Sequence, residues 1–298
     1  MTVQLASNQF GQVDSIKLAD NIDGLVIKHQ YCQAKISLHG GQVLMWQPIE
    51  HQPVFWLSKS SSYQKDKAIR GGIPLCWPWF GSHHNDPENK AGNHGFARQQ
   101  TWQVESIAIT DNDVVVKLMW QGENMHDLFP IACQIKQTLV FGEKFSQQFE
   151  MINLTESEIT YTGALHSYFS VSDPKQIKIA GLSALKFADK LTGEMRDKEV
   201  FINGVGPVDR IYHIDNADNR TMCLVDEGLR RTIKVVAENT QQWVFWNPGE
   251  QLASNMADIH NQGEQEFVCL EAANTQPQML PAHSSTFISQ TIEVFSNN

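Results

Sequence analysis

The chain has 298 residues, of which 41% are hydrophobic and 19% charged, and this balance is typical of a globular protein and excludes a disordered one. Its formal net charge of −10 excludes general binding to nucleic acid or to an anionic membrane, because an acidic surface repels phosphate groups. An anionic ligand would therefore need a local group of basic side chains.

The N-terminal residues predict no signal peptide, because they lack a basic region followed by an apolar one. No later run approaches the roughly 20 apolar residues that span a bilayer. The five cysteines, at positions 32, 76, 133, 223 and 269, are odd in number and form no CxxC pair. We therefore expect a cytoplasmic protein with reduced thiols.

Hydrophobic and polar side chains alternate in short runs along the chain. The runs cover residues 32–38, 114–120, 145–151 and 288–294. Period-two runs bounded by Gly, Asn, Asp and Pro are typical of antiparallel strands. The sequence predicts an all-β protein, a single large antiparallel β-sandwich over residues 1–298, in which residues 1–20 could be an N-terminal extension. Two smaller domains remain an alternative.

Two further segments depart from this alternation. The serine-rich stretch Lys59–Tyr63 predicts a surface loop. The stretch Glu250–Ile259 predicts a short helix.

Two glycine-containing segments carry an arginine each. Arg70 precedes two glycines and an aromatic run that includes Trp77, and Arg98 ends the segment Asn93-His94-Gly95-Phe96-Ala97-Arg98. Glycine lets the backbone approach a ligand closely, and guanidinium groups bind phosphate through a planar fork of donors. The two arginines could form the local positive site that a phosphate needs. The alternative is a rigid loop on the core with two surface salt bridges.

A histidine and a glutamate lie in two apolar strand patterns. His166 shares a face with Ala164 and Tyr168 if its strand is regular, and a neutral-range pKa makes histidine a natural proton donor. Glu271 shares a face with Cys269, where a carboxylate is costly unless it has a partner or a function. The alternatives are a hydrogen-bonded structural histidine and a glutamate at a strand end facing solvent.

Asp209, in the segment Val208–Tyr212, could accept hydrogen bonds from sugar hydroxyl groups. Trp246 ends an aromatic strand pattern and could belong either to the core or to a pocket wall.

Together these segments resemble the hexose-6-phosphate mutarotases of the aldose 1-epimerase superfamily. The matching motifs are RGGIP with WPWFG, NHGFAR, LHSYF, VDRIY, WNP and CLEAAN, in the order that the family uses, from residue 70 to residue 274. Each motif is weak alone, and their joint order and spacing make the match specific. The resemblance implies a galactose mutarotase-like β-sandwich that needs no cofactor and no metal.

The resemblance also implies a role for individual residues. His166 matches the general acid and Glu271 the general base, and the positions that match substrate-binding residues are Arg70, Asn93, Arg98 and Asp209. Asn93 stands where the family has a glutamine, so its side chain is one methylene shorter than the one expected. His94, Trp77 and Trp246 are expected in the pocket wall.

The implied function is the interconversion of the α and β anomers of a hexose 6-phosphate, with glucose 6-phosphate as the expected substrate. A carboxylate would remove the proton of O1 while an imidazolium protonates the ring oxygen. Mutual attraction would lower the pKa of the glutamate and raise that of the histidine, which predicts a bell-shaped pH profile. The expected partner is the small sugar phosphate, with no nucleic acid and no membrane, and the protein is expected to be a monomer.

Other functions remain open from the residues. The same acid–base pair could serve unphosphorylated aldoses, and a sandwich with exposed tryptophans could bind carbohydrate without catalysis. A zinc site formed by His83, His84, Asp86 and His94 is a weaker alternative, because that segment reads as a polar loop. A nucleophilic Cys269 is equally weak, since strand cysteines are usually inert.

Overall fold

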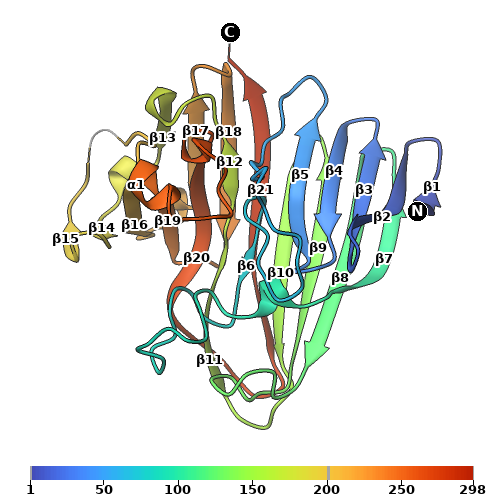
Figure 1. The fold of residues 1–298 in the computed structure, drawn as a ribbon, viewed down its shortest axis with the longest axis horizontal. Helices are drawn as coiled ribbons and strands as arrows, with labels where there is room; N and C mark the ends of the chain where they lie inside the picture. The colour runs from blue at the N-terminus through green and yellow to red at the C-terminus, as the bar shows by residue number, and fades with distance from the viewer. Residues whose placement is uncertain (1, 200–201, 298) are drawn as a thin grey trace.

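The computed structural model describes residues 2–199 and 202–297, and within them the chain folds mainly into antiparallel β-strands (Figure 1). The strands are β1 Val3–Ser7, β2 Gly11–Ala19, β3 Ile22–His29, β4 Cys32–Ser37, β5 Gln42–Pro48, β6 Leu75–Cys76, β7 Gln103–Ile109, β8 Asp113–Gly122, β9 Cys133–Gly142, β10 Phe145–Asn153, β11 Ile159–Leu165, β12 Tyr168–Ser170, β13 Ile177–Ala180, β14 Phe187–Asp189, β15 Glu194–Arg196, β16 Val208–His213, β17 Thr221–Asp226, β18 Arg231–Glu238, β19 Gln242–Asn247, β20 Phe267–Leu280 and β21 Ser285–Ser296. The α-helix is α1 Gly249–Ala253, and short 3₁₀ turns cover Ala97–Gln99, Pro174–Gln176, Leu182–Ala184, Ala217–Arg220 and Gly263–Gln265.

The strands form three sheets in two layers. One eight-stranded sheet, in the order β13-β17-β18-β21-β10-β9-β8-β7, forms the first layer. The second layer contains the five-stranded sheet β1 to β5, which lies over β8 and β9 (Figure 1), and the sheet β15-β14-β16-β19-β20-β11-β6, in which β12 pairs with β20. Single bridges between Val43 and Ile73 and between Phe55 and Phe169 link these two parts. The predicted antiparallel β-sandwich is therefore confirmed.

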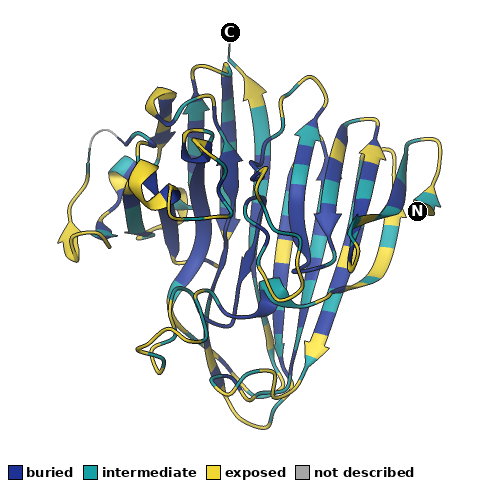
Figure 2. Ribbon diagram, in the orientation of Figure 1, coloured by how far each residue is buried: buried dark blue, intermediate teal, exposed yellow. Residues whose placement is uncertain are grey.

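The period-two runs of the sequence correspond to strands with one face on the core. In β8, Val114, Val116 and Leu118 are buried between the layers, whereas Lys117 is exposed. The same alternation shows as bands along the strands in Figure 2. Burial of these side chains, at about 25 cal/mol per Å² of apolar surface, is the main force that holds the layers together.

The first 20 residues belong to the sheet pairing. Strand β2 pairs with β3 from Gly11–His29 to Ala19–Ile22, and β1 pairs with β2 at the edge. The part that the sequence allowed as an extension thus forms the outer strands of the five-stranded sheet from Val3 onward. Across residues 2–199 and 202–297, no helix has the length and apolar character needed to cross a bilayer.

The helix predicted over Glu250–Ile259 is shorter than expected. It ends at Ala253, because the Ser254 hydroxyl and the Asn255 amide both donate to the carbonyl oxygen of Gln251, at 2.9 and 3.0 Å. Such side-chain bonds compete with the backbone bonds that would continue a helix. Residues 254–259 therefore leave the helix as a chain of turns. The serine-rich stretch Lys59–Tyr63 forms the predicted loop.

The first eight residues of β20 are buried on both faces. Val268, Leu270 and Ala272 point into the main core between the layers, whereas Phe267 and Cys269 belong to a second apolar cluster on the outer face of the sheet. That cluster includes Ala253 of α1 and Ile259, which cover the outer face. Strands buried on both faces read as continuous apolar runs, so the sequence alone did not show which face was inside.

Candidate active site

A cavity of about 450 Å³ opens on the outer face of the sheet that contains β16, β19 and β20. Its volume lies within the range of about 300–1,000 Å³ that is typical of small-molecule sites. Its lining includes eight of the nine residues that the sequence singled out: Arg70, Asn93, His94, Arg98, His166, Asp209, Trp246 and Glu271. Segments as distant in the chain as Arg70 and Glu271 therefore meet in one place.

Strand register places three of these side chains together. Asp209 of β16 is directly opposite Trp246 of β19, and Val244 of β19 is opposite Glu271 of β20. Because side chains alternate between the faces of a strand, Asp209, Trp246, Val244 and Glu271 all project from the outer face into the cavity.

His166 lies where one strand ends and the next begins. The sequence predicted a regular strand here, but β11 ends at Leu165 and β12 starts at Tyr168. The backbone N–H of His166 donates to the carbonyl oxygen of Pro74 at 3.1 Å, so the break is stabilised by a neighbouring loop. The imidazole is parallel to the ring of Tyr168, with the ring centres 4.8 Å apart, and this stacking fixes its orientation in the cavity.

The imidazole and the carboxylate lie side by side. Nδ1 of His166 is 3.3 Å from Oε1 of Glu271, and the two residues are 6% and 1% exposed. Neither Nδ1 of His166 nor Oε2 of Glu271 has a hydrogen-bond partner among the described residues. Buried polar atoms of this kind are rare in folded proteins and often mark a site of function.

Burial shifts both pKa values against the charged forms. The pKa of Glu271 is raised well above its ordinary value by burial and by the nearby Asp209, and the pKa of His166 is lowered well below its ordinary value by burial and by Arg98 and Arg70. The sequence-based expectation was the opposite, because it considered only the attraction within the pair. Removal from water opposes that attraction and favours the neutral forms of both groups in the ligand-free protein.

Arg70 is anchored on one side of the cavity. Its Nε donates to Oδ2 of Asp258 at 2.9 Å and its Nη1 donates to the hydroxyl of Tyr168 at 2.8 Å. The two glycines that follow have φ values of 110° and 63°, and a Cβ on Gly72 would lie 2.1 Å from the carbonyl oxygen of Val43. Only glycine fits such a close approach, so the motif serves to place Arg70 at the cavity.

The NHGFAR motif forms the opposite part of the lining. The Nη2 of Arg98 donates to the carbonyl oxygen of Asn93 at 2.7 Å, so the motif is closed on itself. Nδ1 of His94 accepts the N–H of Gly81 at 3.1 Å, and burial lowers the pKa of His94. His94 is thus held as a neutral ring against the His166 ring, 5.5 Å between centres, which fits the expected wall.

The prediction that Trp77 lines the pocket is wrong. Its side chain is 1% exposed and packs edge-on against Phe96, Phe129 and Phe149 in the main core. The aromatic run after Arg70 turns inward at this residue, and Phe80, three residues later, reaches the cavity instead.

Three residues of the lining, Lys190, Leu252 and Met256, come from parts of the chain where the sequence indicated no functional residue. Lys190 lies on the turn between β14 and β15, with its Nζ 3.6 Å from Oδ2 of Asp209, and Leu252 and Met256 come from α1 and the turn that follows it. These residues lie outside every recognisable motif. An amphipathic reading of residues 249–256 would have indicated the two apolar ones, whereas nothing local pointed to Lys190.

The zinc site considered for the 83–94 segment is not formed. Among the residues that the structure describes, the one group of three or more ligand side chains is His166, Cys269 and Glu271, whose ligand atoms lie within 4.8 Å of one another. Burial raises the pKa of the Cys269 thiol well above its ordinary value, which disfavours the thiolate needed of a nucleophile.

The sequence profile of the family "Aldose 1-epimerase" matches residues 23–291. The chain belongs to the aldose 1-epimerase family. It is 32% identical, over 95% of its length and 94% of the relative, to a protein of Salmonella typhimurium that is provisionally named glucose-6-phosphate 1-epimerase. A protein of Escherichia coli K12 with the same provisional name is 31% identical, over 96% of this chain and 95% of its own.

Solved structures show the same fold in other epimerase-family proteins. A provisionally named mutarotase of Salmonella typhimurium superposes with a TM-score of 0.86 and 29% identity, covering 98% of this chain and 96% of its own. A galactose mutarotase-related enzyme of Lactobacillus acidophilus superposes with a TM-score of 0.71 at 12% identity, covering 92% of this chain and 97% of its own. The fold is therefore the galactose mutarotase-like β-sandwich.

The arrangement supplies the elements of ring opening in an aldose. A group that can accept a proton and a group that can donate one lie 3.3 Å apart at the base of a cavity. Proton transfer of this kind needs no covalent intermediate. Two guanidinium groups and one ammonium group in the lining add sites where an anionic substituent could bind.

Proposed function

We propose that this protein interconverts the α and β anomers of a hexose 6-phosphate, with glucose 6-phosphate as its substrate. The supporting observation is the buried pair of His166 and Glu271 in a cavity that also contains Arg70 and Arg98. The names of the relatives agree with this substrate class.

In the proposed reaction, the Glu271 carboxylate takes the proton from O1 while the C1–O5 bond breaks and the C1=O1 bond forms. The imidazolium of His166 gives its proton to O5, which yields the open-chain aldehyde. Rotation about the C1–C2 bond presents the other face of C1 to O5. The ring then closes as O5 returns its proton to His166 and Glu271 returns its own to O1, so no proton is gained or lost.

The ligand-free pair, a carboxylic acid beside a neutral imidazole, and the reacting pair, a carboxylate beside an imidazolium, contain the same number of protons. A transfer from Glu271 to His166 across the 3.3 Å gap converts one form into the other. Exchange should therefore be fastest between the two pKa values of the pair, with a fall at more acidic pH when both groups are protonated and at more alkaline pH when neither is.

The remaining assignments concern the sugar. Arg70 and Arg98 would bind the phosphate away from C1 and so fix the anomeric carbon between the acid and the base. Asp209 would accept hydrogen bonds from ring hydroxyl groups, and the amide of Asn93, which also lines the cavity, would contact the sugar. Trp246, at the wall, offers an apolar face to the C–H groups of the sugar.

The test is NMR exchange spectroscopy on the anomers of glucose 6-phosphate, with and without the protein. We expect accelerated exchange with the wild type and a loss of about 10²–10⁴-fold in Glu271→Gln, because one positioned proton transfer is removed. The exposed Glu123→Gln is the control and should match the wild type. Equal acceleration by Glu271→Gln and the wild type would refute the acid–base pair.

The same measurement with galactose and glucose tests whether the protein prefers a phosphorylated sugar. If free aldoses exchange as fast as the phosphorylated sugar at equal concentrations, the protein is a general aldose mutarotase. If the wild type binds sugar and accelerates no exchange, it is a carbohydrate-binding protein.

A further inference from the structure

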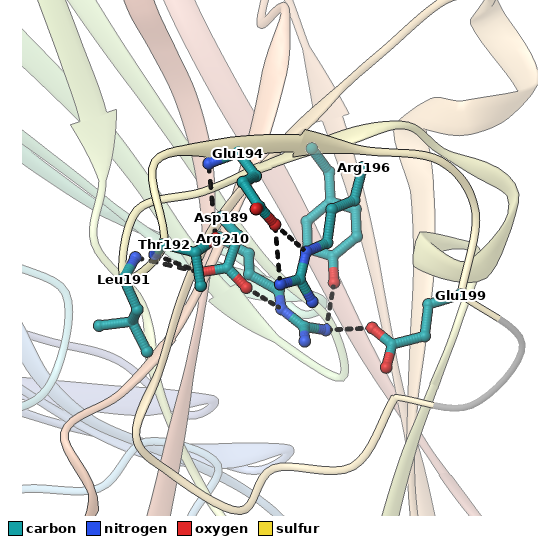
Figure 3. Close-up of polar contacts among 8 residues, drawn as sticks. Asp189, Leu191, Thr192, Glu194, Arg196, Glu199 and Arg210 are labelled. Carbon is teal, nitrogen blue, oxygen red and sulfur yellow. Dashed lines mark hydrogen bonds and ion pairs between the residues drawn. The ribbon is translucent and has the colours of Figure 1, made fainter.

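The turn between β14 and β15 is fixed by a network that does not touch the cavity. The Asp189 carboxylate accepts the N–H of Leu191 at 3.0 Å and that of Thr192 at 3.4 Å, and the N–H of Gly193 donates to the carbonyl oxygen of Asp189 at 2.8 Å. Behind the turn, Arg210 pairs with Asp189, with Nε 3.6 Å from Oδ2, and with Glu199 (Figure 3). The turn is thus held rigidly from the strand side.

Lys190 is the residue that this rigid turn presents to the cavity. Its backbone N–H donates to the carbonyl oxygen of Asp209 at 2.9 Å, which ties the start of the turn to β16. Its side chain crosses the ring of Phe80, with Nζ 5.9 Å from the ring centre, and reaches Oδ2 of Asp209 at 3.6 Å. A backbone bond and an ion pair therefore join the same two residues.

The charges around Asp209 explain why it needs a cation. Asp189 of β14 carries a carboxylate near Asp209, and this like charge raises the free energy of a negative charge on Asp209. The Asp209 side chain is only 25% exposed, so water screens this repulsion weakly. Burial accordingly raises the pKa of Asp209, and Lys190 is the group that opposes this rise.

We propose that Lys190 is a positioning residue of this site, whose ammonium group keeps the Asp209 carboxylate ionised and oriented toward the bound sugar. The inference rests on the proposed function, in which Asp209 accepts hydrogen bonds from ring hydroxyl groups. A carboxylate accepts such bonds with both oxygens, whereas a protonated carboxyl group loses part of this capacity. Lys190 would then affect phosphorylated and free hexoses alike.

The first test measures the side-chain carboxyl pKa of Asp209 by ¹³C NMR titration of the ligand-free protein, so it does not depend on any activity. Lys190→Met removes the charge and keeps the length of the side chain, and we expect the pKa of Asp209 to rise by about one pH unit. Lys190→Arg should restore the wild-type value. Lys186→Met removes an exposed lysine just before β14 and should change nothing.

The second test measures kcat and KM for glucose 6-phosphate and glucose. We expect Lys190→Met to raise KM for both sugars at pH values below the Asp209 pKa that the first test measures in the variant. The effect should be smaller above that pKa, where Asp209 is ionised in the variant as well. Lys190→Arg should restore the wild-type KM. If Lys190→Met acted only by unfolding the turn, restoring the charge would not be enough to recover KM.

Three outcomes would overturn the proposal. An unchanged Asp209 titration in Lys190→Met would show that the ammonium group does not control this carboxylate. A KM increase limited to the phosphorylated sugar would assign Lys190 to the phosphate instead. A KM increase that is equal below and above the Asp209 pKa measured in the variant would indicate a steric role. If the wild type accelerates no exchange, the proposed function fails, while the titration still tests Lys190.

Discussion

The most unusual residue is Glu271, a carboxyl group that is 1% exposed and has one oxygen without a hydrogen-bond partner. Burial raises its pKa well above the ordinary value of about 4.3. Above that ordinary value the unfolded chain releases the proton readily, whereas the folded chain holds it. The free energy of unfolding therefore falls as pH rises from the ordinary pKa of the unfolded chain toward the raised pKa of Glu271 in the folded chain, so the buried carboxyl group costs stability in this range.

Replacement of Glu271 by glutamine should remove this cost. We expect the Tm of Glu271→Gln to be close to that of the wild type at pH 4 and to exceed it increasingly from pH 5 to pH 8, by several degrees at the upper end. Differential scanning calorimetry across this pH range measures the difference. Glu123→Gln, at an exposed site, should show no such trend. A Tm for Glu271→Gln that falls below the wild type as pH rises would mean that the carboxylate is stabilised in the folded state.

The identities of the paired residues followed from the sequence, but their electrostatics did not. The motifs LHSYF and CLEAAN indicated His166 and Glu271 as partners. The direction of their pKa shifts depends on burial by segments that are distant in the chain, which no local pattern describes. Lys190 escaped notice for a similar reason, since only the pairing of β14 with β16 brings it to Asp209.

At the scale of elements, the segment from α1 to Ile259 covers the outer face of β20 and also orients Arg70. The helix ends early, and the turns that follow bring Asp258 to Nε of Arg70 at 2.9 Å. Both side chains are partly exposed, at 22% and 31%, so the ion pair itself adds little stability. Its effect is to restrict the guanidinium group to one orientation at the cavity.

We expect Asp258→Ala to raise KM for hexose 6-phosphate about tenfold and to leave kcat nearly unchanged, because an Arg70 held by Tyr168 alone has more freedom to lose on binding. Asp258→Asn keeps an acceptor oxygen and should recover part of the loss. Steady-state kinetics of anomer exchange measures both, with the exposed Asp197→Ala as control. Tighter binding of the sugar phosphate by Asp258→Ala would show that Asp258 competes with the phosphate for Arg70.

At the scale of the whole molecule, the alternating runs were enough to predict the sandwich, because period two with one buried face permits few other folds. The alternating runs were not enough to predict what covers the outer face of the sheet that contains β20. Strand β20 is apolar on both sides, and the cover that makes its outer face a cavity comes from α1 and from the loops around Arg70 and Arg98. That cover consists largely of turns and loops, whose contacts cannot be predicted from the hydrophobic periodicity of the sequence.

The two layers are also joined by a buried cation. Arg231 of β18, in the first layer, is 2% exposed, and its guanidinium donates to the carbonyl oxygens of Gln52 and Pro53 at 3.0 and 3.1 Å and of Ser170 at 2.7 Å. Gln52 and Pro53 follow β5 and Ser170 ends β12, so one side chain of the first layer satisfies three acceptors of the second layer. A buried acceptor without a partner costs about 1–3 kcal/mol.

Arg231→Met, which fills a similar volume and donates nothing, should lower the free energy of unfolding by about 1–3 kcal/mol, because three partly shielded carbonyl groups lose their charged donor. Arg231→Lys should recover only part of this loss, because an ammonium group cannot reach three carbonyl oxygens with the spread of a planar fork. Urea unfolding followed by tryptophan fluorescence measures both variants against Lys234→Met, a change on the same strand. If Arg231→Met unfolds at the same urea concentration as that control, the layers are held by apolar packing alone and the three carbonyl groups find other donors.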